Sequence, residues 1–180
     1  MASKLSAKTL FDLVKSTEDY KVNPELGVSL DEVVHGGAEY RTYKRKMKKS
    51  FFSFLKKDTK YALYMKNVRY NKVVVPRIVI ACNPDTEGSL QSKCKVVNEM
   101  LTDFAATMKL KNPPKEGCPY LQPSTQCQYL RTLLAGMRDD YGWDYTLDSS
   151  FNFKGGVKAV VDQLFEKRRR DFPEVSFLAC

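Results

Sequence analysis

The sequence has little histidine, and its cysteines are not spaced as metal ligands. The one histidine, His35, stands in VVHGGAE without a partner at the spacing of a catalytic triad, a zinc site or a general base. The cysteines are odd in number, and no two of them form a C-x-x-C pair: Cys82, Cys94, Cys118, Cys127 and Cys180. We interpret them as reduced thiols and expect neither a disulfide framework nor a zinc site.

Glycine motifs that bind phosphate are missing as well. The pairs Gly36–Gly37 and Gly155–Gly156 occur without the P-loop pattern or the G-x-G-x-x-G fingerprint. Glu99 and Asp103 can share a helix face at their i,i+4 spacing, but no second pair of metal ligands accompanies them. A solvated acidic face is the simpler interpretation, and we expect no cofactor and no metal.

Long apolar runs are also absent. No stretch approaches the roughly 20 apolar residues that a membrane-spanning helix needs. The N-terminal MASKLSAKTLFDLVKSTEDY becomes charged before the apolar region of a signal peptide can form. We therefore expect an intracellular protein with no membrane contact.

Acidic residues are outnumbered by basic ones. The chain has 30 Lys and Arg against 21 Asp and Glu, which gives a net charge of +9. With 180 residues, 43% of them hydrophobic and 28% charged, it is typical of a folded protein with one domain or two small ones. The excess of positive charge favours an acidic partner such as nucleic acid.

Helical patterns open the chain. A first helix is expected over residues 6–16, and Ser29 with Glu32 has the form of a capping box for a short helix that ends at Gly36–Gly37. Aromatic and apolar residues then recur at nearly helical spacing between Tyr40 and Leu55. The following residues, 60–82, are rich in Val, Ile and Tyr, which predicts strands or an extended connector interrupted at Pro76.

The second half of the chain predicts a small helical bundle. A helix is expected from Leu90, with apolar residues at steps of three and four up to Met108. After a proline-rich link, a second helix is expected to begin just after Pro123, with Ser124 or Thr125 as its cap, and to end near Gly142. Its expected buried stripe is Leu130, Leu133, Leu134, Met137 and Tyr141. A last helix runs through GGVKAVVDQLFEKRRRD, with these side chains expected inward: Val157, Val160, Val161, Leu164 and Phe165.

The fold class predicted from these patterns is mainly α. It combines a helical bundle in the C-terminal half, a helical N-terminal region and a short extended segment near residues 60–82. We divide the chain into a basic region at 1–86 and a helical domain at 87–180.

Basic residues are interleaved with aromatic ones in the middle of the chain. Residues 41–77 contain thirteen Lys or Arg and one acid, Asp58. Cations neutralise phosphates, and exposed aromatic rings can stack on unpaired bases. The alternative is that the rings form a core that the lysines solvate. The candidate nucleic-acid contacts in this run are Arg41, Lys44, Arg45 and Lys48.

Two shorter basic patterns have more than one interpretation. YKRKMKK has the form of a nuclear-localisation patch, which makes the nucleus a candidate location. Arg168 and Arg169 belong to EKRRRD at the end of the last helix. Cations are favoured there by the helix dipole alone, although we also count these two arginines as candidate DNA contacts.

Residues 91–172 resemble a known DNA-binding domain. The motifs that carry the resemblance are VVNEMLTDFAATMKLK, a link with prolines, PSTQCQYLRTLLAGM, the aromatic YGW and FNFKGGVKAVVDQLFEKR. In this arrangement the chain is similar to the N-terminal core-binding (SAM-like) domain of tyrosine recombinases and phage-type integrases, especially the divergent eukaryotic kind found in Crypton transposons. The resemblance covers a little under half of the chain.

The resemblance implies a four-helix bundle that clamps one side of duplex DNA. By position in the motifs, it implies that the following residues face DNA: Thr125, Gln128, Arg131 and Arg138 in the central helix, then Lys154 and Lys158 at the start of the next. Arg131 and Arg138 are two helical turns apart, so both lie on one side of the helix, roughly 10 Å apart along its axis. They would contact phosphates and position the protein rather than read bases.

The chain departs from the family in its catalytic part. A tyrosine recombinase needs a second domain with a tyrosine nucleophile and paired arginines, whereas here the sequence ends at Cys180, soon after the last predicted helix. We therefore expect a DNA-binding module that is not an enzyme, either a fragment or truncated product of a mobile element or a stand-alone module derived from one. Two alternatives stay open: a protein-interaction module whose apolar stripes include a partner surface, and an enzyme that uses Cys127 or a tyrosine as nucleophile, for which no activating base is evident.

Overall fold

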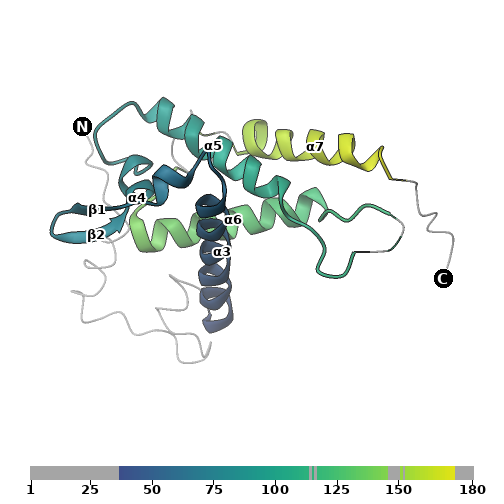
Figure 1. The fold of residues 1–180 in the computed structure, drawn as a ribbon, viewed down its shortest axis with the longest axis horizontal. Helices are drawn as coiled ribbons and strands as arrows, with labels where there is room; N and C mark the ends of the chain where they lie inside the picture. Colours follow the sequence, from purple (N-terminus) through teal and green to yellow (C-terminus); the bar gives the residue numbers. More distant parts are fainter. Residues whose placement is uncertain (1–36, 114, 116, 146–150, 152, 173–180) are drawn as a thin grey trace, which may run out of the picture.

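The computed structural model describes residues 37–113, 115, 117–145, 151 and 153–172. The helices expected over residues 6–16 and from Ser29 lie outside the described residues, as do His35 and Cys180. The described part is mainly helical with one small antiparallel sheet, which confirms the predicted fold class (Figure 1). Its elements are α3 (Ala38–Lys57), a 3-10 turn (Ala62–Met65), β1 (Asn67–Tyr70), β2 (Val73–Pro76), α4 (Arg77–Ala81), α5 (Leu90–Ala106), α6 (Pro123–Tyr141), a π turn (Lys154–Lys158) and α7 (Ala159–Arg169).

Helix α3 forms where the aromatic spacing predicted it. Phe51 and Leu55, one turn apart, are completely buried. The helix ends at Asp58, whose extended backbone no longer continues the ladder and whose N–H donates to the carbonyl of Phe54. The helix therefore buries one stripe and leaves a wide face to solvent.

The Val-rich segment is only partly extended. Strands β1 and β2 confirm the expected extended character, but the expectation was wrong for residues 77–81, which form α4. Pro76 directly precedes this helix with φ −58°, and two residues of the helix, Ile78 and Val79, are buried. β-branched residues have low helix propensity, but burying these two side chains against the core outweighs that preference.

Helix α6 begins and ends at residues with fixed backbone preferences. Pro123 occupies its first turn, where a missing amide hydrogen costs nothing, and Gly142 ends it with φ +72°. The expected cap at Ser124 or Thr125 was wrong, because Gln122 is the cap residue and both hydroxyl residues lie inside the helix. Leu130, Leu133 and Met137 are buried as predicted, while Leu134 and Tyr141 are half-buried against the same core.

The last helix contains a local shift of register. Residues 154–158 form a π turn, in which the Lys158 N–H donates to the Phe153 carbonyl at 2.8 Å. Val157, Val161 and Phe165 point inward as predicted, but Val160 is exposed. Val160 is about 100° from Val161 and about 140° from Phe165 around the helix, so it lies outside the stripe that these buried residues define.

A single hydrophobic core joins the two regions that we divided at residue 86. It contains Phe51 of α3 and Ile78 of α4 together with side chains of α5, α6 and α7. Helix α3 crosses α6 at Gly136, where an added Cβ would lie 3.3 Å from Lys44 Cβ. The expected boundary between residues 86 and 87 thus falls inside one packed unit.

Hydrogen bonds attach the end of α6 to the short helix α4. The indole of Trp143 donates to the Val79 carbonyl at 3.2 Å, and the hydroxyl of Tyr145 donates to the Cys82 carbonyl. The Asn83 side chain donates to the Tyr141 carbonyl at 2.9 Å. These contacts hold the base of the β1–β2 hairpin, which precedes α4, against the helical body.

Candidate nucleic-acid interface

Helix α3 presents a row of cations to solvent. At 100° per residue, five basic side chains fall within an arc of about 120°, and Glu39, in the first turn of the helix, lies at one edge of that arc. None of the described carboxylates forms an ion pair with any of these five basic side chains. We call this surface the α3 cationic face; its residues are Arg45, Lys46, Lys49, Lys56 and Lys57, all exposed.

The remaining lysines of this helix segment point the other way and are neutralised. Lys44 is buried, and its ammonium group contacts the Asp139 carboxylate of α6 at 2.5 Å. Lys48 pairs with Asp140 and lies over the ring of Tyr141. Both lysines were candidate DNA contacts, but the structure uses them to join α3 to α6. Asp139 and Asp140 are thereby engaged on the inner side of α3, so they do not offset the charge of the outer face.

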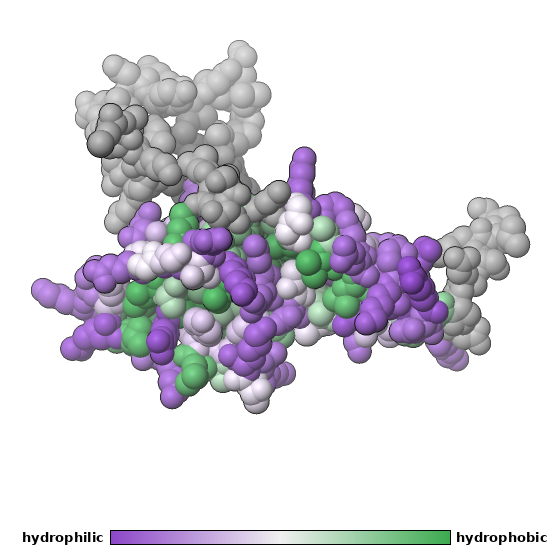
Figure 2. Space-filling view, turned by 90° about the horizontal axis from the view of Figure 1, so that it is seen from above, coloured by the Kyte–Doolittle hydropathy of each residue, from purple (hydrophilic) through white to green (hydrophobic). Residues whose placement is uncertain are grey.

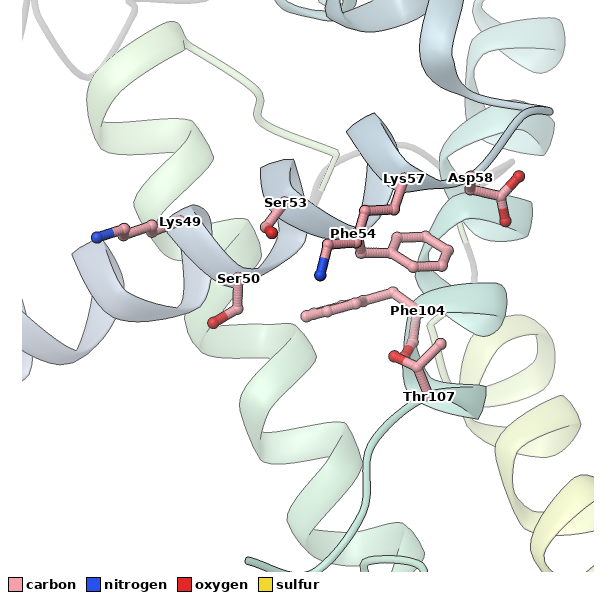
Figure 3. A pocket seen from close by; sticks show the side chains of 8 residues that line it. All are labelled: Lys49, Ser50, Ser53, Phe54, Lys57, Asp58, Phe104 and Thr107. Atoms are coloured by element: carbon pink, nitrogen blue, oxygen red, sulfur yellow. The ribbon is translucent and has the colours of Figure 1, made fainter.

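A shallow depression lies at the end of the α3 cationic face (Figure 3). It measures about 660 Å³ and is lined by Lys49, Ser50, Ser53, Phe54, Lys57, Asp58, Phe104 and Thr107. Its floor contains the rings of Phe54 and Phe104, whose centroids are 5.5 Å apart. The depression thus combines an aromatic floor with two lysines, Lys49 and Lys57, and one acid, Asp58.

The second cationic surface lies where α6 meets the π turn. Arg131 is exposed, and its guanidinium lies over the ring of Phe153 at 4.9 Å. Lys154, the residue after Phe153 in the chain, is exposed. Lys158 forms an ion pair with Asp162, one turn further along. The cation–π contact fixes the position of the Arg131 head while leaving its other face open. We call Arg131 and Lys154 the Arg131 cluster.

The other residues implied for α6 differ in their environments. Gln128 is exposed one turn before Arg131, whereas Thr125 is half-buried in the first turn. Arg138 is half-buried, and its Nε lies 3.7 Å from the Asp139 carboxylate. Arg131 and Arg138 therefore share a side of the helix, as their spacing predicts. Their surroundings differ, because Arg138 has an acid, Asp139, beside it, whereas Arg131 has none as close among the described residues.

The arginines of α7 are engaged with the protein in unequal ways. Arg168 donates to the Ala106 carbonyl at 2.7 Å and lies over the ring of Tyr120 at 4.2 Å. It therefore ties α7 to the end of α5. Arg169 is exposed and forms an i,i+3 ion pair with Glu166 at 3.8 Å. Arg41, at the other end of the basic run, is half-buried in the first turns of α3.

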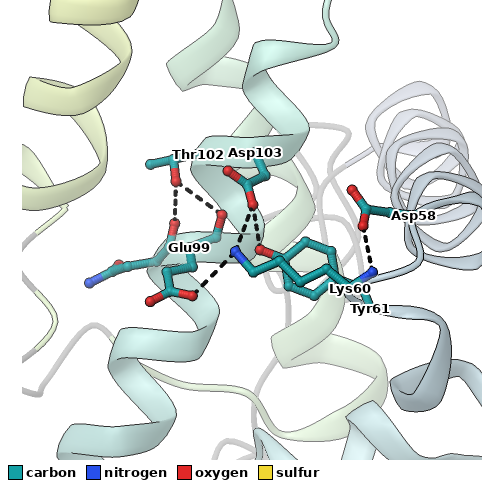
Figure 4. Close-up of polar contacts among 7 residues, drawn as sticks. Asp58, Lys60, Tyr61, Glu99, Thr102 and Asp103 are labelled. Atoms are coloured by element: carbon teal, nitrogen blue, oxygen red, sulfur yellow. Dashed lines mark hydrogen bonds and ion pairs between the residues drawn. The ribbon is translucent and has the colours of Figure 1, made fainter.

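The acidic pair Glu99 and Asp103 is bound by neighbouring side chains (Figure 4). Lys60 lies 3.4 Å from Glu99 and 3.1 Å from Asp103, and the Tyr61 hydroxyl donates to Asp103 at 2.5 Å. Burial, together with this hydrogen bond, raises the pKa of Tyr61 to about 12. The pair is thus part of the contact between α5 and the segment after α3, and it is not the simple solvated face that we expected.

Burial also changes the cysteine chemistry. It raises the pKa of the Cys82 thiol to about 12 and raises the pKa of Cys127, which disfavours the thiolate that a nucleophile needs. Among the described residues, no group of three or more His, Cys, Asp or Glu side chains is placed to hold a metal ion. None of the described helices has the length and apolar character that a membrane span requires.

Sequence reasoning missed most of the α3 cationic face as a site. Lys46, Lys49, Lys56 and Lys57 were counted in the basic run but not selected as contacts, whereas Lys44 and Lys48 were. Helical phase relative to Phe51 and Leu55 is the signal that separates the two sets: the selected pair lies on the inner side of the helix.

No family model, curated protein or solved structure matches this chain. The likeness of residues 91–172 to a recombinase core-binding domain therefore stays a prediction.

Proposed function

We propose that this chain binds duplex DNA through its phosphates, with little dependence on base sequence, and that the α3 cationic face is the main contact. The observation that carries the proposal is the sorting of charge on α3. Eight Lys or Arg and a single acid lie on this helix, and five of the cations share the outer face. Each phosphate that they neutralise releases condensed counterions, which is the dominant source of nonspecific DNA affinity.

The Arg131 cluster is the second contact in this proposal. Arg131 is held over Phe153 with a polar neighbour, Gln128, one turn away, and the exposed Lys154 follows Phe153 in the chain. A guanidinium fixed in this way loses little side-chain freedom when it meets a phosphate. The likeness to a DNA-clamping domain supports the same residues, so binding without catalysis is the activity we assign.

The test compares two variants with equal loss of charge. Arg45→Ala/Lys46→Ala/Lys49→Ala removes three cations of the α3 cationic face, and Lys95→Ala/Lys111→Ala/Lys115→Ala removes three exposed cations elsewhere. Binding to a labelled random-sequence duplex of about 30 base pairs is measured from about 50 to 200 mM salt. The α3 variant is expected to lower the slope of log K against log salt by about 2.7, since each lost phosphate contact removes about 0.9. The control is expected to change it by less than about 1.

Two results would overturn the proposal in different ways. An equal loss in both variants would mean that net charge, and not the α3 cationic face, determines affinity. No binding by the unmodified protein at low salt would remove the DNA-binding function, and the protein-interaction module would become the working assignment.

A further inference from the structure

The β1–β2 hairpin is a short arm with a tight end. Its strands pair antiparallel with Tyr70 opposite Val73, so only Asn71 and Lys72 form the turn. Both turn residues have positive φ, 47° and 66°, which is the conformation of the two-residue turns that match the twist of a hairpin. At the other end, the Arg77 N–H donates to the Lys66 carbonyl at 2.8 Å.

Solvent reaches both faces of this arm. Directly opposed residues project to the same face, so Arg69 and Val74 share one face and Tyr70 and Val73 share the other. Val74 is 60% exposed, Val73 58% and Tyr70 46%. The hairpin therefore extends from the helical body and does not lie flat on it, as its place at the left end of Figure 1 shows.

The arm is cationic as well as apolar. No acidic residue occurs from Thr59 to Pro84. Lys66, Arg69, Lys72 and Arg77 are exposed around the hairpin. At the corresponding end of Figure 2, hydrophilic side chains project beside hydrophobic ones. A partner that suits this surface carries negative charge next to apolar groups.

The dimensions of the arm select one groove of duplex DNA. Two paired strands lie about 4.8 Å apart, and the side chains on the two faces give the ribbon a thickness of roughly 10 Å. The major groove, about 12 Å wide, admits a two-stranded ribbon, whereas the minor groove is only about 6 Å wide. The major groove also offers phosphates on its rims, guanine acceptors and thymine methyl groups on its floor.

We propose that the β1–β2 hairpin enters the major groove of the bound duplex. Arg69 donates to a guanine edge, Lys72 contacts a phosphate at the rim, and Val74 meets the apolar groups of the floor. This inference rests on the proposed DNA-binding function and deepens it, because it adds a contact to the bases to the phosphate contacts of α3.

The hairpin variant for the test is Arg69→Ala/Lys72→Asn. Asparagine tolerates the left-handed conformation at position 72, so the turn is kept, and both side chains are exposed. On duplexes with G-containing sites, the variant is expected to bind about tenfold more weakly than the unmodified protein. An unchanged circular dichroism spectrum and thermal midpoint serve as the folding control.

Methylation interference identifies the groove. Methyl groups on guanine N7 lie in the major groove and are expected to weaken binding of the unmodified protein, while those on adenine N3, in the minor groove, are expected to have no effect. The N7 effect is expected to disappear in the hairpin variant.

Failure of the hairpin proposal can be distinguished from failure of the proposed DNA-binding function. If the α3 variant loses affinity and the hairpin variant binds like the unmodified protein, DNA binding stands and the hairpin proposal is wrong. Interference at adenine N3 alone would also overturn it. If the hairpin substitutions change self-association without affecting DNA affinity, the arm contacts protein instead. If the unmodified protein binds no duplex, the proposed function itself fails.

Discussion

The Lys44 ammonium group of α3 lies 2.5 Å from the Asp139 carboxylate of α6, with side chains that are only 8% and 17% exposed. Gly136, one turn before Asp139, allows this approach, because a Cβ at that position would lie 3.3 Å from Lys44 Cβ. A cation from the most basic run of the chain thus serves the packing of two helices. Its partner is 95 residues away in the sequence.

Asp139→Asn should destabilise the protein through this ion pair. The substitution leaves Lys44 charged and largely buried, and removing one partner of a buried pair costs about 3–5 kcal/mol. Because Asp139 retains some solvent contact, we expect a loss of about 2 kcal/mol in the free energy of unfolding, measured by urea denaturation.

The adjacent Asp140 provides the control for that substitution. Its side chain is 46% exposed in its contact with Lys48, so Asp140→Asn should cost less than about 1 kcal/mol. Equal losses for the two variants would show that the Lys44 pair has no special role in joining α3 to α6.

Alkaline pH should weaken the fold through the buried thiol of Cys82. The pKa of Cys82 is about 12 in the folded protein, against an ordinary value of 9.0, because burial favours the neutral thiol. The unfolded chain releases this proton at lower pH, so the stabilisation is complete below pH 9.0 and is lost as pH rises from 9.0 towards 12. Tyr61, whose pKa is also raised to about 12, acts in the same direction.

Urea titrations at a series of pH values measure this loss. The free energy of unfolding should fall by up to about 1.4 kcal/mol per pH unit for each such group. In Cys82→Ala the fall between about pH 9.5 and 11 should be shallower. An identical slope in the variant would contradict a contribution from the Cys82 thiol.

Arg131 and Arg138 should contribute unequally to DNA binding. Arg131 is exposed over Phe153, while the charge of Arg138 is partly offset by Asp139, 3.7 Å away. We expect Arg131→Ala to lower the salt slope by about 0.9 and Arg138→Ala by about half of that or less. Equal reductions, which their seven-residue spacing alone would predict, would argue that Asp139 does not screen Arg138.

Local patterns were sufficient for much of the helical structure. The steps of three and four from Leu90 predicted α5, and Pro123 and Gly142 marked the ends of α6, because such residues restrict the backbone wherever they occur. The same reasoning failed at Ile78, where burial overrides strand propensity, and at Val160, which lies outside the buried stripe of Val157, Val161 and Phe165. The burial of Ile78 has no signal in the neighbouring residues.

The candidate site was less predictable than the helices. Helical phase relative to Phe51 and Leu55 separates Lys44 from Arg45, but the sequence does not show that Asp139, on another helix, is the partner that gives Lys44 its structural role. Arg168 is a similar case, since the carbonyl of Ala106 and the ring of Tyr120 that engage it come from other elements.

The sequence by itself determined the charge of this protein, its helical character and the register of its longest helices, because these depend on composition and on contacts within a few residues. The tertiary structure decided which cations are paired with acids. That choice depends on where α6 places Asp139 and Asp140 against α3, and such contacts exist only once distant segments have packed.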